Sequence, residues 1–357
     1  MRKIIFLLVT LGTPSLLTTS ILADWHPRVY NAIKWTAPNQ GSRTIEYTTN
    51  QGITYVPIAY HGGVDWNESG EITASNIKRF TDWVHQELPS DYCGPVVIDY
   101  EQPWRVELSA KTCTPERLQE ILNVYGEGIR IAQSIQPMSQ WGYWGMPLLR
   151  NTGKSWKEQG LSMQQLTTQC TALYPDIYDA SRGSEQIKRA KNHISSVLEL
   201  AAGEIPVYAF VSPRFAGEDG DHSKFVPDDV FLRRVNAAMQ ASWSDESGMQ
   251  HKIQGVILWD TYNFSPESEW VELDQKHKYY FELLQALVRA WAEASNGTPI
   301  DTCVNETHGC QFGLPEPKNS GDVLPQGSQT RITPKLEVPR IEKERVPSGR
   351  VPSHRTE

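Results

Sequence analysis

Short apolar runs alternate with longer stretches of helical periodicity between Asp24 and about Leu287. Several of the runs are apolar almost throughout, which is typical of strands that are buried on both faces. Seven β-strands are predicted in this way, at residues 29–35, 54–58, 95–100, 140–145, 173–178, 205–211 and 254–259.

The stretches between the strands carry apolar residues at helical spacing. They predict α-helices at residues 74–86, 115–135, 162–170, 185–202, 228–242 and 276–294. Thr73 and Thr114 stand just before two of these helices, and threonine is a preferred N-cap residue. About seven βα units without a glycine-rich dinucleotide fingerprint favour a (β/α) barrel of the TIM type over a doubly wound sheet. We therefore expect one α/β barrel domain with seven or eight strands over residues 24–295.

The two ends of the chain lie outside this pattern. Arg2 and Lys3 precede an apolar run at residues 4–11, and a second apolar patch ends at the small residue Ala23. This order predicts a secretory signal peptide over residues 1–23, and hence a secreted or periplasmic protein. No later run reaches about 18 apolar residues, so we expect no stable membrane span after the signal peptide. Residues 313–357 hold seven prolines and mixed charges, which predict a disordered tail.

Composition narrows the classes of function. The formal net charge is −8, which argues against a nucleic-acid partner because such proteins usually carry a clustered excess of Lys and Arg. The chain also has twelve Trp and fourteen Tyr residues. Exposed aromatic rings stack on sugars, although packing in the core is the alternative for any single ring.

The five cysteines fit no zinc-site spacing, and no metal is predicted. Because five is an odd number, at least one cysteine is unpaired or pairs with another molecule. Cys303 and Cys310 enclose a polar loop in a short extension over residues 296–312. They form the most credible disulfide in an oxidising compartment.

The sharpest local signal is the run Val-Val-Ile-Asp-Tyr-Glu at residues 96–101, in which Asp99 and Glu101 end an apolar strand. Residues two apart on a strand point to the same side, so both carboxylates face the mouth of a barrel, about 6–7 Å apart at the backbone. Close carboxylates disfavour each other's ionisation, and burial raises a carboxyl pKa. One of the two can then stay protonated near neutral pH and act as a general acid. The alternative is a pair of structural carboxylates that form salt bridges with Arg105 or Lys111.

Several motifs resemble those of the hyaluronidase family of glycoside hydrolases. Residues 35–38, Trp-Thr-Ala-Pro, are similar to the family's Trp-Asn-x-Pro, and residues 97–105 are similar to its Val-Ile-Asp-Trp-Glu-x-Trp-Arg-Pro. The run Trp-Gly-Tyr-Trp-Gly-Met-Pro at 141–147 resembles Trp-Gly-Phe-Tyr-Gly-Phe-Pro, and Ala-Leu-Tyr-Pro-Asp-Ile-Tyr at 172–178 resembles Ala-Leu-Tyr-Pro-Ser-Ile-Tyr. Residues 205–208 and 255–259 resemble its last two barrel strands. The motifs follow the family's order from about residue 35 to residue 264.

The resemblance implies a barrel with a sugar cleft at the carboxyl ends of its strands, and no cofactor. It implies that Glu101 is the proton donor and that Asp99 orients or polarises the N-acetyl group of the substrate, whose oxygen attacks the anomeric carbon. Tyr178 and Trp259 match residues that line the subsite for the acetamido sugar. The further substrate-binding candidates are Tyr143, Trp144, Tyr208, Phe210 and Arg105.

This sequence also departs from the family pattern. The spacing from Glu101 to Trp104 is one residue longer, Val106 stands in place of the proline, and Phe210 lacks the hydroxyl of the second subsite tyrosine. Together with the signal peptide, the resemblance implies a secreted endo-glycosidase that hydrolyses N-acetylhexosaminidic bonds of a glycosaminoglycan-type polysaccharide by substrate-assisted acid catalysis with retention. The alternatives are a non-catalytic carbohydrate-binding relative, a lysozyme-like barrel or a chitinase-like barrel. The chitinase signature Asp-x-Asp-x-Glu would need an acid at Val97.

Overall fold

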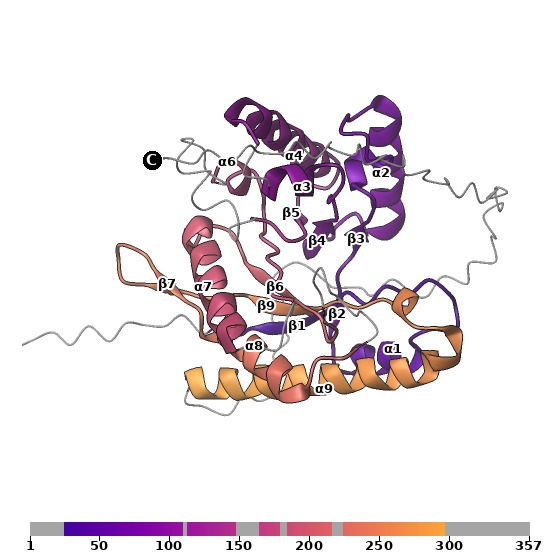
Figure 1. Cartoon of the computed structure of the whole chain (residues 1–357), viewed down its shortest axis with the longest axis vertical. Helices are drawn as coiled ribbons and strands as arrows, with labels where there is room; N and C mark the ends of the chain where they lie inside the picture. The colour runs from indigo at the N-terminus through magenta and orange to yellow at the C-terminus, as the bar shows by residue number, and fades with distance from the viewer. Residues whose placement is uncertain (1–24, 110–112, 148–163, 179–183, 216–223, 297–357) are drawn as a thin grey trace, which may run out of the picture. The chain divides into compact units, whose positions relative to one another are not determined.

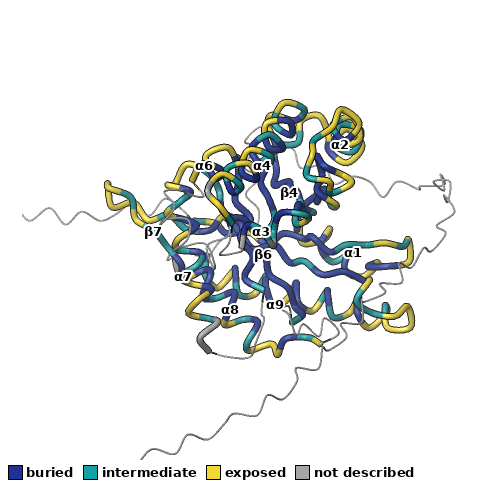
Figure 2. Tube along the Cα trace, turned by 45° about the horizontal axis from the view of Figure 1, so that its top comes forward, coloured by how far each residue is buried: buried dark blue, intermediate teal, exposed yellow. Residues whose placement is uncertain are grey.

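The computed structural model describes residues 25–109, 113–147, 164–178, 184–215 and 224–296. These residues form a mixed α/β fold in which parallel strands lie between helices (Figure 1). The strands and the inner faces of the helices are buried, whereas the outer faces of the helices are exposed (Figure 2). The predicted α/β class is therefore confirmed.

Two parallel sheets carry the fold. Their strands are β1 (Arg28–Asn31), β2 (Thr54–Tyr55), β3 (Ile58–Ala59), β4 (Pro95–Ile98), β5 (Gln140–Tyr143), β6 (Tyr208–Val211) and β9 (Gly255–Leu258). One sheet has the order β2-β1-β9-β6 and the other has the order β3-β4-β5. In the first sheet, Tyr30 of β1 and Phe210 of β6 both lie opposite Ile257 of β9. A short antiparallel hairpin of β7 (Trp243–Ser244) and β8 (Gln250–His251) stands apart from both sheets.

Hydrogen bonds join the two sheets through the segment that contains β2 and β3. The Val56 N–H donates to the carbonyl of Asn31 (2.7 Å), and the Val97 N–H donates to the carbonyl of Pro57 (3.0 Å). The segment over residues 54–59 therefore pairs with β1 at its start and with β4 at its end. The sequence predicted one strand over residues 54–58, and the structure divides it at Val56 and Pro57.

The segment over residues 172–177 joins the sheets on their other side. The Leu173 N–H donates to the carbonyl of Pro206 (2.9 Å), and the Phe210 N–H donates to the carbonyl of Pro175 (2.9 Å). A single-residue parallel bridge also pairs Tyr174 with Trp144, just after β5. A full strand was predicted at residues 173–178, and the structure has isolated parallel bridges there instead.

Helices cover the strands on both sides. They are α1 (Ser42–Asn50), α2 (Ala74–Glu87), α3 (Trp104–Ser109), α4 (Pro115–Ile135), α6 (Gln164–Thr167), α7 (Ser184–Ala201), α8 (Asp228–Gln240) and α9 (Trp270–Asn296). In Figure 1, α2 and α4 lie on one side of the strands, and α1, α8 and α9 lie on the other. Thr73 and Thr114 accept hydrogen bonds from the backbone N–H of Asn76 and Arg117, so both predicted N-caps are confirmed. The six predicted helices are present, with a longer α9 and a shorter α6, whereas α1, α3 and the β7–β8 hairpin were not predicted.

Alternate side chains of the strands enter two separate core clusters. The larger cluster packs the strands against the helices and includes Val96, Ile98 and Val256. The smaller cluster contains residues from both sheets. It comprises Tyr30, Ala32, Val56, Ile58, Val97, Ala172, Tyr174, Tyr208, Phe210 and Ile257. The strands are therefore buried on both faces, as their continuous apolar runs predicted.

Some predictions concern residues that the structure does not describe. The signal peptide over residues 1–23, the Cys303–Cys310 disulfide and its extension to residue 312, and the tail over residues 313–357 all lie outside the described ranges. They stay predictions. Among the described helices, none combines the length and the apolar content that crossing a membrane requires.

Candidate active site

A cavity of about 310 Å³, here called the strand-end cavity, opens at the carboxyl ends of the parallel strands. Its lining residues are Ile58, Tyr60, Asp99, Glu101, Arg105, Trp144, Tyr178, Ser212, Trp259 and Phe264. Tyr60, Asp99, Trp144, Ser212 and Trp259 are each the first residue after a strand, namely after β3, β4, β5, β6 and β9. Because the carboxyl ends of parallel strands meet at one edge, these side chains converge although they are distant in the sequence.

The alternation of side chains along each strand decides which residues reach the cavity. Asp99 stands two residues after Val97, and Trp259 stands two residues after Ile257. Because Val97 and Ile257 belong to the smaller core cluster, the side chains of Asp99 and Trp259 point to the same face of the strands as that cluster. Of the predicted site residues, the structure brings together Asp99, Glu101, Arg105, Trp144, Tyr178 and Trp259.

Three predicted substrate-binding residues do not line the cavity. Tyr143 is one position out of phase, so its buried ring faces α4 and its hydroxyl donates to the carbonyl of Tyr125 (2.8 Å). Tyr208 and Phe210 are in phase but lie within the smaller core cluster. The hydroxyl of Tyr208 donates to Oε1 of Gln140 (2.6 Å), and Phe210 packs edge-on against a neighbouring tyrosine.

The two carboxyl groups differ in their surroundings. Asp99 is partly buried, and burial raises its pKa to about 6, although the positive charges of Arg105, Lys34 and His61 pull the pKa down. Glu101 is 43% exposed and forms an ion pair with Arg105. The salt bridge to Arg105 that the structural alternative describes is therefore present at Glu101, whereas Lys111 lies outside the described residues.

Three aromatic side chains form one wall of the cavity. Tyr178 and Trp259 stack with their ring centroids 5.8 Å apart, and Nε1 of Trp144 donates to the Tyr178 hydroxyl (3.3 Å). Nε1 of Trp259 donates to the hydroxyl of Tyr60 (3.3 Å). Burial raises the pKa of Tyr178 well above its ordinary value, so its hydroxyl stays protonated at neutral pH. The wall thus offers flat apolar faces together with a hydroxyl group, as sugar-binding sites do.

Positive charges lie beside the aromatic rings. Nζ of Lys34 is 3.8 Å from the centroid of the Tyr60 ring, and the guanidinium of Arg105 is 4.4 Å from that of Trp144. Sequence reasoning missed Lys34, together with the lining residues Ser212 and Phe264. The sequence pattern could have indicated Lys34. Its side chain comes two residues after Ala32 and four after Tyr30, and both of those residues belong to the smaller core cluster.

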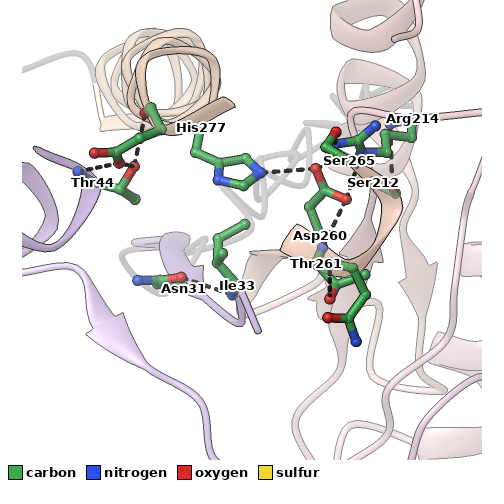
Figure 3. Close-up of polar contacts among 11 residues, drawn as sticks. Asn31, Ile33, Thr44, Ser212, Arg214, Asp260, Thr261, Ser265 and His277 are labelled. Carbon is green, nitrogen blue, oxygen red and sulfur yellow. Dashed lines mark hydrogen bonds and ion pairs between the residues drawn. The ribbon is translucent and has the colours of Figure 1, made fainter. Parts of the chain in front are cut away.

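A buried polar network is centred on Asp260, the residue after Trp259 (Figure 3). Asp260 follows Trp259 and points the opposite way, and Nε of Arg214 lies 2.8 Å from both of its carboxylate oxygens. His277 of α9 places Nε2 2.8 Å from Oδ2 of Asp260, and all three side chains are buried. Arg214 also donates to Oγ of Ser265 (3.1 Å). The network therefore joins the ends of β9 and β6 to α9 and to the turn that carries the lining residue Phe264.

The cavity combines an acid pair, aromatic rings and cations. Within the described ranges, no three His, Cys, Asp or Glu side chains are grouped so that they could hold a metal ion. The chemistry that these residues offer is proton transfer by a carboxyl group in a cavity lined by aromatic rings.

No protein-family model and no curated protein matches this sequence. The fold is similar to that of bee venom hyaluronidase in its monoclinic crystal structure, with a TM-score of 0.51 and 14% identity over 73% of this chain and 99% of that one. The crystal structure of bee venom hyaluronidase in complex with a hyaluronic acid tetramer is similar too, with a TM-score of 0.50 and 14% identity over 70% of this chain and 95% of that one. At this identity the likeness shows a shared fold and a distant structural relationship.

Proposed function

We propose that this protein is a hyaluronidase-like endo-glycosidase that hydrolyses N-acetylhexosaminidic bonds in a glycosaminoglycan-type polysaccharide. The observation that carries this proposal is the meeting of Asp99 and Glu101 with Trp144, Tyr178 and Trp259 in one cavity at the strand ends. The similar fold of a hyaluronidase that was crystallised with a hyaluronic acid tetramer supports it.

We also infer that the parallel strands close into a seven-stranded barrel. Its ring would run through β1, residues 54–59, β4, β5, residues 172–177, β6 and β9, back to β1. The hydrogen bonds at Val56 and Val97 support closure on one side, and those at Leu173 and Phe210 support it on the other. The smaller core cluster, to which both sheets contribute, would fill the interior of this barrel.

In the proposed reaction, Glu101 gives its proton to the glycosidic oxygen as the bond from that oxygen to the anomeric carbon breaks. The acetamido oxygen of the same sugar forms the new bond to the anomeric carbon, so no protein nucleophile is needed. The Asp99 carboxylate accepts a hydrogen bond from the acetamido N–H and balances the charge that develops on the ring. Water then attacks the anomeric carbon and Glu101 takes its proton, so that two inversions give retention.

The charges around the cavity support an anionic polysaccharide as the substrate. The protein carries a net charge of −8, yet Lys34, His61 and Arg105 all act electrostatically on Asp99. Local positive charge can bind a carboxylate-bearing sugar although the whole molecule is acidic. Tyr178 and Trp259 offer the flat surface on which the acetamido sugar packs.

One observation favours the second candidate, a carbohydrate-binding protein without turnover. Glu101 is ion-paired with Arg105, and a paired carboxylate has to leave its partner before it can carry a proton. In this alternative, the cavity binds the sugar and Glu101 serves only to hold Arg105.

The decisive experiment measures new reducing ends released from hyaluronan, chondroitin, chitin oligomers and peptidoglycan. Glu101→Gln removes the titrating proton with little change of shape, so the rate should fall about 10²-fold or more. The matched control is Glu246→Gln, at an exposed glutamate in the β7–β8 turn, which should leave the rate unchanged.

The outcomes separate the candidates. Turnover of a glycosaminoglycan that is lost only in Glu101→Gln supports the proposed enzyme, whereas turnover of only chitin oligomers or only peptidoglycan supports a chitinase-like or lysozyme-like activity. Sugar binding without turnover by the wild type would replace the enzyme with the binding protein.

Export of the protein is part of the proposal. The charge and apolar pattern of residues 1–23 supports a cleaved signal peptide and a secreted or periplasmic location. N-terminal sequencing of the mature protein tests this directly, because a mature chain that still begins at Met1 would contradict it.

A further inference from the structure

The loop after β3, residues 61–70, lies beside the strand-end cavity and presents an exposed tryptophan. Tyr60, the residue before it, lines the cavity. The N–H of Gly62 donates to the carbonyl of Asp99 (2.8 Å), which fixes the loop to the strand end that carries the acid pair. Trp66 is 37% exposed and is one of few large apolar side chains with that much exposure among the described residues.

A buried carboxylate holds this loop in one shape. Asp65 is fully buried and accepts hydrogen bonds from the Tyr100 hydroxyl (2.7 Å), the Gly70 N–H (2.7 Å) and Nδ2 of Asn76 (3.1 Å). These donors come from the loop itself, from the residue after Asp99 and from α2. A ligand that binds Trp66 therefore meets a side chain whose loop is already ordered, which lowers the entropy cost of binding.

The side chains of Arg79 and His61 lie against the indole of Trp66. The guanidinium of Arg79 lies 3.3 Å from the centroid of the Trp66 ring, and the ring of His61 lies 5.1 Å from it. Arg79 and His61 are both exposed. Since Arg79 covers one face of the indole, the exposed surface of Trp66 lies on the remainder of the ring. His61 directly follows Tyr60, which lines the cavity, so this group of side chains begins beside the cavity.

We propose that Trp66, Arg79 and His61 form a second sugar subsite, which takes an anionic pyranose unit of the polysaccharide beyond the unit held in the strand-end cavity. This inference rests on the proposed function, because it assumes a sugar in that cavity. The pyranose ring packs on the indole of Trp66, and its carboxylate faces Arg79 and His61. The subsite makes the protein bind long chains more tightly than short ones.

The test compares oligosaccharide binding in the Glu101→Gln background by isothermal titration calorimetry, with a hyaluronan decasaccharide and a hyaluronan tetrasaccharide as probes. Adding Trp66→Ala should weaken decasaccharide binding about fivefold and leave tetrasaccharide binding unchanged. The matched control is Trp243→Ala, because Trp243 also packs against a histidine, at 5.3 Å, but belongs to the β7–β8 hairpin, which stands apart from both parallel sheets. Arg79→Gln should weaken binding of the anionic decasaccharide and not of a neutral chitin oligomer.

The results decide the subsite and the proposed function separately. Equal decasaccharide affinities with and without Trp66→Ala, equal losses for both lengths, or no decasaccharide binding at all would each overturn the subsite. The proposed function is tested instead by reducing-end release from the wild type. If the wild type releases no reducing ends, yet Trp66→Ala selectively weakens decasaccharide binding, the subsite is supported and the protein is a carbohydrate-binding protein without turnover.

Discussion

Asp99 is a carboxyl group whose surroundings pull its pKa in opposite directions. Burial raises the pKa, the charges of Arg105, Lys34 and His61 lower it, and the result is about 6. Asp99 is therefore protonated below about pH 6 and ionised above it. The carboxylate that the proposed reaction requires at this position forms only toward neutral pH, at a cost to the stability of the fold.

That cost predicts a stabilising substitution. The folded state binds the Asp99 proton more tightly than the unfolded state, whose pKa is about 3.9, so stability falls as the pH rises from about 4 to about 6. Above that range the full cost, up to about 3 kcal/mol, is present. Asp99→Asn should raise the Tm at pH 7.5 and leave it unchanged at pH 4, as measured by calorimetry. Asp91→Asn, at an exposed aspartate, is the control, and an equal gain at both pH values would refute the explanation.

Phe210 gives a second prediction at this scale. The side chain is fully buried and packs edge-on against Tyr174 at 6.1 Å, although the family resemblance places a subsite tyrosine there. Phe210→Tyr should lower the free energy of unfolding by about 1–3 kcal/mol, because the new hydroxyl enters a close-packed layer. Urea unfolding measures this, with Phe264→Tyr in the cavity lining as the tolerated control. A gain in activity without a loss of stability would place Phe210 in the site after all.

At the scale of elements, α1 shows why sequence reasoning missed a helix. Its sequence Ser-Arg-Thr-Ile-Glu-Tyr-Thr-Thr-Asn is rich in residues of low helix propensity. The helix begins where the side chain of Asp274, on α9, accepts hydrogen bonds from the N–H groups of Arg43 (2.9 Å) and Thr44 (3.0 Å). A cap supplied from α9 cannot be read from the local sequence. By contrast, α2 and α4 carry their own threonine caps and were predicted with nearly the observed bounds.

The sequence could predict those site residues that stand at the carboxyl ends of strands. Asp99 and Trp259 each stand at the end of an apolar run, and the alternation of their strands faces them into the cavity. The prediction that Tyr143 binds the substrate was wrong, because Tyr143 is adjacent to Trp144 and its side chain points to the opposite face of the strand. The alternation of side chains along the strand could have indicated this. Loop 61–70 was not predictable, because its shape depends on hydrogen bonds to a buried aspartate from side chains outside the loop.

The buried pair of Arg214 and Asp260 predicts a large loss of stability. Arg214→Met leaves the Asp260 carboxylate buried without its guanidinium partner and should cost about 3–5 kcal/mol in urea unfolding. Arg233→Met removes an exposed i,i+4 pair with Asp229, whose side chains are 56% and 72% exposed, and should cost less than about 1 kcal/mol. Similar losses in the two variants would show that the buried pair does not hold the wall.

At the scale of the whole molecule, closure of the strands predicts a pattern of hydrogen exchange. The amides of Val56, Val97 and Leu173 donate to the carbonyls of Asn31, Pro57 and Pro206 and so tie residues 54–59 and 172–177 to their neighbours. In a closed barrel these amides should exchange as slowly as the amide of Ile257 within β9. The amide of the exposed Gly248 in the β7–β8 turn should exchange many times faster. Exchange at Leu173 as fast as at Gly248 would indicate an open edge at residues 172–177.

The cavity has two walls with separate anchors. Loop 61–70 is held by Asp65, and the end of β9 is held by Asp260 through Arg214 and His277. Asp65 and Asp260 share no hydrogen-bond partner among the described residues, and the two walls meet where Nε1 of Trp259 donates to the hydroxyl of Tyr60 (3.3 Å). For the proposed enzyme, we expect that a library at the exposed positions of residues 61–70, with Tyr60 and Asp65 unchanged, alters the preference for chain length while the acid pair stays in place.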